Sequence, residues 1–432
     1  MDIGSPSAWM ARVRLFALSG AGLGLVAACW ALARVPNLVL APGTFLVFFS
    51  LAFVAYGCGA LAAYQLRGRP GVVIIGAVGL VARAILLPVS PSLSTDAYRY
   101  VWDARVAAAG IDPYAYAPSA PHVAPLRDST IYPRLNHPTW QTVYPPPAQA
   151  FFRAVYWIAP DSVIAMKLAL GLVELLALAA LALLLRTLDL PLGRLAIYAW
   201  NPLLLVEIWG DGHLDALVLA TVTLAALASA RRRDGLAAAL LGLGTLFKLY
   251  PVILFPLLPG RRRASVIVAF ASVIGAGIVA TGGLAHWPVA PIGRYVRDEY
   301  FNPGLVRSLV NEPAPALAVA AAWVIAVAWR GGARHLAQRA VPLVAGFIVL
   351  APNVFPWYAV WLVPLLAVTP SAAMIAFTGT VAFAYAFFLS DPWAIPWWAR
   401  LVELAPLGYA LARELRAFWP EGWRAHAGAS VE

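Results

Sequence analysis

Long apolar runs, separated by short basic turns or longer polar stretches, occupy most of the chain. A helix of about 20 apolar residues crosses the ~30 Å hydrocarbon layer of a membrane, and runs of that order recur throughout. The pattern therefore predicts one all-α transmembrane domain, residues 1–432, built as a polytopic helix bundle of roughly a dozen spans. We place one span so that it ends before Arg231. The others lie at about 13–33, 43–65, 71–89, 162–185, 195–209, 264–284, 314–329, 340–352, 358–369, 371–389 and 398–412.

Basic residues decide the orientation of these spans. Arginines precede the first span at Arg12 and follow the last at Arg413, and cytoplasmic loops are the ones enriched in Lys and Arg. Both termini are then expected in the cytoplasm of a multi-pass cell-membrane protein. The polar segments 90–160 and 285–313 fall on the extracytoplasmic side, and their proline-rich, irregular backbone cannot lie in lipid.

The stretch 235–259 lies between two triple-arginine clusters, so a single crossing would leave one cluster outside. Lys248 and Pro251 stand at its middle, and we expect two short half-helices that enter the membrane and return. In the third run, Arg83 must face the bundle interior or extend to the membrane surface.

Composition supports a lipid environment. Hydrophobic residues make up 62% of the chain and charged residues 12%, about half the charged fraction of a soluble domain. The net charge of +11 is concentrated beside apolar runs, which indicates orientation in a membrane and no nucleic-acid partner. Cys29 and Cys58 lie within apolar runs and predict neither a disulfide nor a metal site.

Asp96 is the first candidate for chemistry, because it closely follows the third span and precedes a stretch with helical spacing. That stretch predicts an amphipathic helix on the outer membrane surface, with an Arg99–Asp103 ion pair four residues apart. Asp96 could simply cap this helix. Alternatively, it is a general base at the membrane edge, able to take a proton from an acceptor hydroxyl.

A second cluster of ionisable residues, Asp211, His213 and Asp215, stands at the outer end of a span. Helix capping, sugar or acceptor hydrogen bonding, and a weakly supported metal site all fit this spacing. Lys248, deep in an apolar stretch, either contacts a phosphate anion or forms an ion pair, for which Glu207 is our candidate partner.

Further candidates are basic or aromatic. Arg294 and Arg307 could bind phosphate by paired hydrogen bonds, or merely contact lipid headgroups. Aromatic rings could stack on sugar faces, although a belt of aromatic residues at the membrane interface explains many of them equally well. The candidates for contact with substrate, some of which also have a purely structural explanation, are Tyr98, Arg99, His137, Tyr144, Asp211, His213, Asp215, Lys248, Arg294, Arg307, Trp357 and Tyr358.

Five motifs occur in a distinctive order, namely YRYVWDARVAAAGIDPYAYAP, LNHPTWQTVYPPPAQ, GDGHLD, FKLYPVILFPLL and PNVFPWYAVWLVPLL. Together they resemble the polyprenol-phosphate-mannose-dependent mannosyltransferases of bacteria, within the C-type glycosyltransferase (GT-C) superfamily. The resemblance implies that Asp96 is the catalytic acidic residue. Two features depart from the superfamily: Asp96 has no acidic neighbour beside it, and its loop follows the third predicted span rather than the first.

The resemblance implies an enzyme that transfers a sugar, typically mannose, from a polyprenyl-phosphate donor to a lipid or glycan hydroxyl, with inversion, on the extracytoplasmic face. We expect membrane lipid around the protein, no cofactor and no metal ion. A transporter or flippase of a lipid-linked or polar substrate is the alternative, but such folds usually show repeated halves and more charged residues at mid-depth. A structural or assembly protein is a third possibility.

Overall fold

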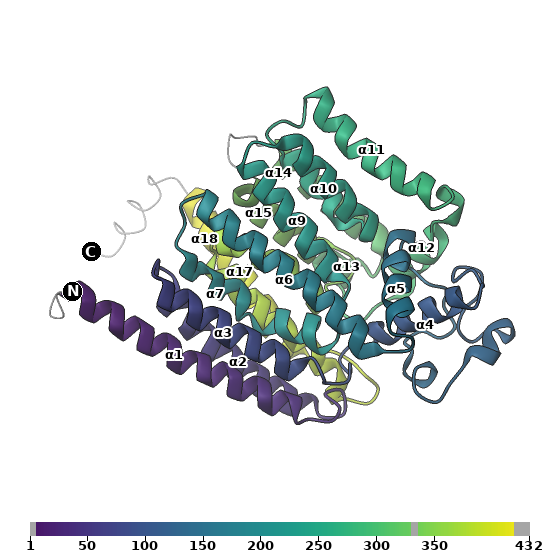
Figure 1. Ribbon diagram of the computed structural model, residues 1–432, viewed down its shortest axis with the longest axis horizontal. Helices are drawn as coiled ribbons and strands as arrows, with labels where there is room; N and C mark the ends of the chain where they lie inside the picture. Colours follow the sequence, from purple (N-terminus) through teal and green to yellow (C-terminus); the bar gives the residue numbers. More distant parts are fainter. Residues whose placement is uncertain (1–5, 330–335, 419–432) are drawn as a thin grey trace, which may run out of the picture.

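The protein is a bundle of helices (Figure 1). The computed structural model describes residues 6–329 and 336–418. Within these two ranges no β-strand forms, and the one isolated bridge pairs Pro303 with Asn353. The predicted all-α class is therefore confirmed.

Five helical stretches are long and apolar enough to cross a membrane. Three of them come first in the chain, and the second and third both pack on the first. In each of the three only about a third of the most apolar window is buried, so the remaining side chains are free to face lipid. The five are α1 (Pro6–Ala33), α2 (Pro42–Ala63), α3 (Arg69–Leu86), α6 (Val163–Thr187) and the pair α17 (Ala372–Thr380) and η8 (Val381–Leu389).

A sixth candidate is bent by 71° where α11 (Ala264–Ala280) leads through η6 (Leu284–His286) into α12 (Val289–Asp298). The other apolar helices are shorter than a full crossing. The structure therefore has five candidate membrane spans, or six if the bent pair is one span, and the figure of roughly a dozen stays a prediction. The remaining helices that follow α12 in the chain are α13 (Leu305–Val310), α14 (Pro313–Trp329), α15 (Leu336–Leu350), η7 (Pro356–Leu362), α16 (Val363–Val368) and α18 (Trp397–Phe418).

The polar segment 90–160 gathers at one end of the bundle with α12, opposite the end at which α1 begins (Figure 1). It contains α4 (Asp96–Ala108), η1 (Pro121–Leu126), η2 (Tyr132–Arg134) and α5 (Pro146–Ile158). The predicted helix after Asp96 is confirmed as α4, and all ten of its residues from Ala97 to Val106 are buried within the protein. Its place at the outer membrane surface stays a prediction. Its polar side chains are satisfied by the protein instead of water: Asp103 accepts hydrogen bonds from Arg99 and from Gln149 of α5 at 2.8 Å each, which also confirms the predicted Arg99–Asp103 pair.

The predicted continuous span 195–209 is broken. It divides into α7 (Leu195–Ala199), α8 (Pro202–Leu204) and η4 (Leu205–Gly210), a short π-helical turn, after η3 (Leu192–Arg194). Proline at 202 disfavours helical geometry at Asn201, whose side chain instead caps the next turn by accepting from the Leu204 amide. The π-turn carries Glu207 into the interior, and such turns are frequent at functional sites.

The stretch predicted to enter and return forms two short helices, α10 (Asp234–Phe247) and η5 (Tyr250–Leu257), which pack on each other. Helix α10 also packs on α9 (Asp215–Ala230). The helix breaks at Lys248, whose backbone is extended. Gly260, after η5, lies so close to Asp234 that a β-carbon there would meet its carboxylate. The chain therefore returns close to its starting point, with Lys248 at the turn.

Arg83 lies in the bundle interior, one of the two positions that its sequence context allows. Its guanidinium binds Glu174 of α6 through two hydrogen bonds of 2.9 and 2.7 Å, and both side chains are buried. Trp209 donates a third hydrogen bond to Glu174 at 2.9 Å. This pair joins α3 to α6 beneath the polar end of the bundle.

Candidate active site

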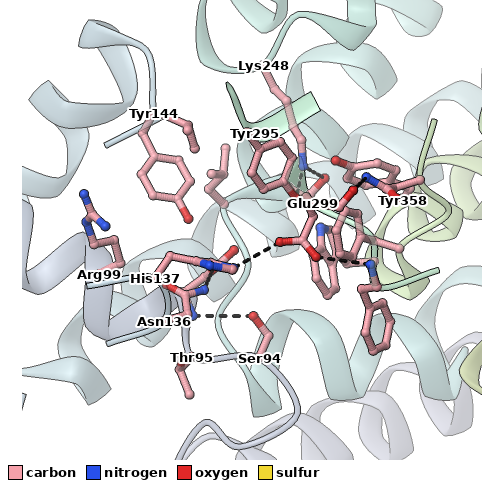
Figure 2. A pocket seen from close by; sticks show the side chains of 18 of the residues that line it. Ser94, Thr95, Arg99, Asn136, His137, Tyr144, Lys248, Tyr295, Glu299 and Tyr358 are labelled. Atoms are coloured by element: carbon pink, nitrogen blue, oxygen red, sulfur yellow. Dashed lines mark hydrogen bonds and ion pairs between the residues drawn. The ribbon is translucent and has the colours of Figure 1, made fainter. Parts of the chain in front are cut away.

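A cavity of about 960 Å³ opens at the polar end of the molecule. Its walls come from segment 90–160, the start of α9, the Lys248 turn, α12 with the residues after it, and the stretch that follows α15. The volume is at the upper end of the range for small-molecule sites, enough for a sugar and a phosphate. Figure 2 shows the polar side chains at its centre. Much of the rest is aromatic, including Tyr144, Tyr250, Tyr295, Phe355, Trp357, Tyr358 and Trp361.

Asp96 is the first residue of α4 and lines this cavity. The N-cap position is Thr95, and the hydrogen bond that the Asp96 side chain accepts comes from Asn136 and not from a backbone amide of the helix, so capping alone does not explain Asp96. One carboxylate oxygen accepts a hydrogen bond from Asn136 Nδ2 at 2.6 Å, and the other lies 3.6 Å from His213 Nδ1. With 17% of the side chain exposed, the carboxylate is held in place yet reachable from the cavity.

His213 lies behind Asp96, away from the cavity, with 1% of its side chain exposed. Its Nε2 atom is 3.2 Å from Glu207 Oε2, and Glu207 accepts a hydrogen bond from the Tyr385 hydroxyl at 2.9 Å. The imidazole stacks on Trp357, with ring centres 4.3 Å apart. Asp96 is therefore backed by a buried imidazole, and that imidazole by a buried carboxylate.

Lys248 extends from the turn between α10 and η5 into the cavity (Figure 2). Its ammonium lies 2.9 and 3.0 Å from the two carboxylate oxygens of Asp215, and over the rings of Tyr358 and Trp361 at 4.6 and 5.2 Å. The expected ion pair with Glu207 is wrong. The helix break puts Lys248 beside the first turn of α9, whereas Glu207 turns toward His213.

The opposite wall joins the two polar segments. His137 Nε2 lies 3.0 Å from Glu299 Oε2, and the His137 ring stacks on Trp140 at 4.3 Å (Figure 2). His137 adopts a left-handed backbone with φ of 44°, an uncommon conformation in which histidine is enriched. Glu299 puts a second carboxylate into the cavity.

Eight of the predicted site residues line the cavity: Asp96, Arg99, His137, Tyr144, Asp215, Lys248, Trp357 and Tyr358. The other five lie outside its wall. Tyr98 is buried under Arg134, Arg294 pairs with Asp298, and His213 lies behind Asp96. Asp211 accepts the Ser92 amide, and Arg307 donates to backbone carbonyls of its own segment, among them that of Glu299 at 2.8 Å.

The three ionisable residues of the GDGHLD motif thus point to different partners: Asp211 to Ser92, His213 to Asp96 and Glu207, and Asp215 to Lys248. Among residues 6–329 and 336–418, no group of three or more His, Cys, Asp or Glu side chains is arranged to hold a metal ion. The motif instead contributes Asp215, which pairs with Lys248 at the cavity, and His213, which lies behind Asp96.

The sequence analysis missed Asn136, Arg134 and Glu299. Arg134 lines the cavity and, within the described part of the chain, has no carboxylate within 4 Å. Each of these residues lies in an irregular loop among several polar neighbours, and no periodicity distinguishes those that turn inward. Glu299 could have been suspected only from its place in a long polar segment beside Asp298.

A helical membrane protein with a carboxylate, cations and aromatic rings around one large cavity has the features of an enzyme for a substrate that is part polar and part lipid. The family model described as alpha-(1->6)-mannopyranosyltransferase, N-terminal domain, matches residues 7–259 of the 432-residue chain. The chain belongs to that family and is a glycosyltransferase of the mannosyltransferase class. This decides against the transporter alternative. No curated protein and no solved structure matches the chain.

Proposed function

We propose that the protein transfers mannose from a polyprenyl-phosphate donor to a hydroxyl of a lipid or glycan acceptor, with Asp96 as the general base, by a GT-C-type mechanism. The observation that carries this proposal is the presence of the Asp96 carboxylate in the same cavity as Lys248 and Arg134. A base and a set of cations in one cavity are what sugar transfer from a phosphate requires.

Asp96 suits the role of base because it is anchored and accessible at once. The Asn136 amide occupies one carboxylate oxygen, and no Lys or Arg pairs with Asp96 in the described ranges. In the reaction, the acceptor oxygen bonds to C1 of mannose as the bond from C1 to the phosphate oxygen breaks. The acceptor proton passes to Asp96, and the polyprenyl phosphate leaves with the electron pair.

The leaving phosphate needs positive charge, and the cavity offers three cations: Lys248, Arg134 and Arg99. Lys248 is held by Asp215 and two aromatic rings, so its position is fixed before substrate binds. Arg134 lies in the wall without a carboxylate partner in the described residues, so it can bind a phosphate oxygen without losing an existing ion pair. We assign the phosphate to these two residues and leave Arg99 to its pair with Asp103.

The aromatic walls suit both ends of the donor. Tyr144 presents a ring on which the apolar face of a sugar can stack, and the outward apolar helices offer a path for the polyprenyl chain. Trp357 and Tyr358 line the same cavity but already stack on His213 and Phe355 and on Trp361, respectively. Glu299 can accept hydrogen bonds from hydroxyls of the acceptor, and His137 can donate to them or accept from them.

The family description names an α-(1→6) linkage, and we propose the same product here. In-line attack inverts C1, so an α product requires a β-linked donor. The sorting of basic turns in the sequence favours a reaction on the extracytoplasmic face, with both termini in the cytoplasm and segments 90–160 and 285–313 outside.

The test uses the purified full chain in lipid nanodiscs. It is incubated with radiolabelled β-mannosyl polyprenyl phosphate and a lipid extract as acceptor, and product linkage is determined by α-mannosidase digestion and methylation analysis. We expect an α-(1→6)-mannosylated product, formed without any nucleotide sugar. Transfer from a nucleotide-mannose donor, with none from the lipid-linked donor, would refute the proposed donor.

A further inference from the structure

We propose that His213 and Glu207 are positioning residues for Asp96, in which a protonated His213, balanced by Glu207, holds the Asp96 carboxylate ionised and aimed into the cavity. The inference rests on the proposed role of Asp96 as general base. It assigns a role to two buried groups that do not line the cavity and do not touch the substrate.

The geometry places the imidazole between two carboxylates. His213 Nδ1 faces Asp96 Oδ2 at 3.6 Å, and Nε2 faces Glu207 Oε2 at 3.2 Å. Trp357 covers the flat face of the imidazole, with the planes 20° apart, so rotation of the ring would cost that stacking contact. Trp357 therefore fixes the plane of the ring, and in this orientation one nitrogen faces each acid.

Charge balance favours a protonated imidazole. Glu207 is fully buried, and in the described part of the chain His213 is the basic side chain within 4 Å of it. A buried carboxylate without a cation is costly. Glu207 Oε2 and His213 Nε2 lie 3.2 Å apart, and neither atom has a hydrogen-bond partner among the described residues. Positive charge on the imidazole is what offsets the buried carboxylate.

Three other ionisable groups lie around His213. Asp215 binds Lys248, and the Tyr100 hydroxyl accepts the Leu214 amide. Asp211 accepts the Ser92 amide through Oδ1, while its Oδ2 is buried with no hydrogen-bond partner among the described residues. The ammonium of Lys167 donates to backbone carbonyls, among them that of Leu87 at 2.7 Å. His213 is thus the cationic group that faces Asp96 from behind.

This arrangement predicts which limb of the pH–rate profile shifts when Glu207 is replaced by glutamine. With glutamine at 207, the imidazole loses the anion that keeps it protonated, and Asp96 loses its cationic neighbour. A carboxylate without a cationic neighbour is protonated more readily. The acidic limb of kcat/KM should move to higher pH by about one unit, which is about tenfold in rate on that limb, while the loss at high pH is smaller.

The experiment compares wild type, Glu207→Gln and Tyr385→Phe in the nanodisc assay across pH. Tyr385→Phe removes the hydrogen bond to Glu207 and leaves its charge, so it should shift the limb in the same direction by less. Glu403→Gln is the matched control, a buried carboxylate bonded to Asn302 and Arg400, and should leave the limb in place.

A uniform loss of rate at all pH values in both Glu207→Gln and Tyr385→Phe, or a profile that superposes on wild type, would overturn the inference. If Glu207→Gln does not fold, Tyr385→Phe alone decides. Asp96→Asn separates the two levels of the account. Full activity in Asp96→Asn would refute the proposed base itself, whereas its inactivity with unshifted Glu207→Gln and Tyr385→Phe profiles would refute only the positioning pair.

Discussion

At the residue scale, Lys248 is held at the turn between two short helices by Asp215, two aromatic rings and the cavity wall. Its side chain is 23% exposed and that of Asp215 is 1% exposed. The ammonium thus has one side toward a buried anion and another toward the cavity. Substitutions at Lys248 and Asp215 can therefore distinguish a structural role of the ion pair from binding of a substrate anion by Lys248.

Lys248→Met should weaken donor binding, measured as a rise in the dissociation constant for polyprenyl phosphate of about tenfold or more, because hydrogen bonds to charged groups contribute about 1.5–3 kcal/mol. It should also destabilise the fold, since Asp215 is left buried without its cation. The double variant Lys248→Met/Asp215→Asn should recover thermal stability without recovering affinity. Recovery of both would show that Lys248 acts only in the ion pair.

Sequence reasoning identified Lys248 because an intramembrane lysine must have a partner. It chose Glu207 as that partner, and the structure gives Asp215. The error has a physical origin: the break at Pro202 and the π-turn rotate Glu207 toward His213, and neither the break nor the rotation follows from apolar periodicity. Asp96 was found because its place, next to a span and before a helical pattern, is a local property of the sequence.

At the scale of single elements, the Arg83–Glu174 pair fixes α3 against α6 with both side chains buried. Arg83→Met should cost about 3–5 kcal/mol of unfolding free energy, because Glu174 would remain as a buried, unpaired charge. Thermal unfolding in detergent measures the effect. Arg67→Met is the matched control: its pair with Asp189 is 60% and 93% exposed, and the expected cost is about 0–1 kcal/mol. Equal losses in the two variants would contradict this account.

Segment 90–160 is secured by Arg105, which binds Asp128 at 2.9 Å and Asp161 at 2.7 Å. Burial disfavours the charged form of Asp128, but hydrogen bonds from Arg105, from the Thr130 hydroxyl and from two backbone amides outweigh it and hold its pKa below the ordinary 3.8. Since the folded state has the lower pKa, this contribution is present in full above pH 3.8 and is lost as pH falls below that value.

Limited proteolysis by a protease that stays active from pH 3 to pH 7 should therefore cut within 118–131 increasingly as pH drops below about 4, close to the ordinary carboxyl pKa. Asp128→Asn should be cut readily at neutral pH and should lose most of the pH dependence. A wild-type segment as resistant at pH 3 as at pH 7 would show that the clamp does not hold it.

The elements differ in how well the sequence predicts them. The long runs α1, α2, α3 and α6 follow from apolar length alone. The burial of α4 does not, because its alternating polar and apolar residues suit a membrane surface as well as a protein interior. Partners such as Gln149 lie far along the chain, and only tertiary contact shows that Asp103 is satisfied inside the protein.

At the scale of the whole molecule, the account requires the chain to enter and return between α9 and α11. Asp234 and Gly260 lie side by side, which places the two triple-arginine clusters together. With Cys29 and Cys58 replaced by serine, single cysteines at positions 232 and 262 should react with an impermeant maleimide from the same side of sealed vesicles. Labelling from opposite sides would show that this stretch is a full crossing.

The sequence did not predict the cavity itself, although eight of the residues that line it were already candidates from the sequence. The sequence grouped polar motifs on one side of the membrane through the positions of the arginines. It could not give the pairing of His137 with Glu299, which joins two loops far apart in the chain. Contacts of that kind depend on how irregular segments fold back, and no local pattern encodes them.

The most direct test of the central claim compares Asp96→Asn with Asp112→Asn in single-turnover transfer from β-mannosyl polyprenyl phosphate. Asp112 serves as control because it lies in the same segment and only closes a turn by accepting the Tyr114 amide. Asp96→Asn should bind donor normally and lose at least about 100-fold in the transfer rate, the scale of general-base catalysis, while Asp112→Asn stays within about threefold of wild type. Transfer by Asp96→Asn at the wild-type rate would contradict the account.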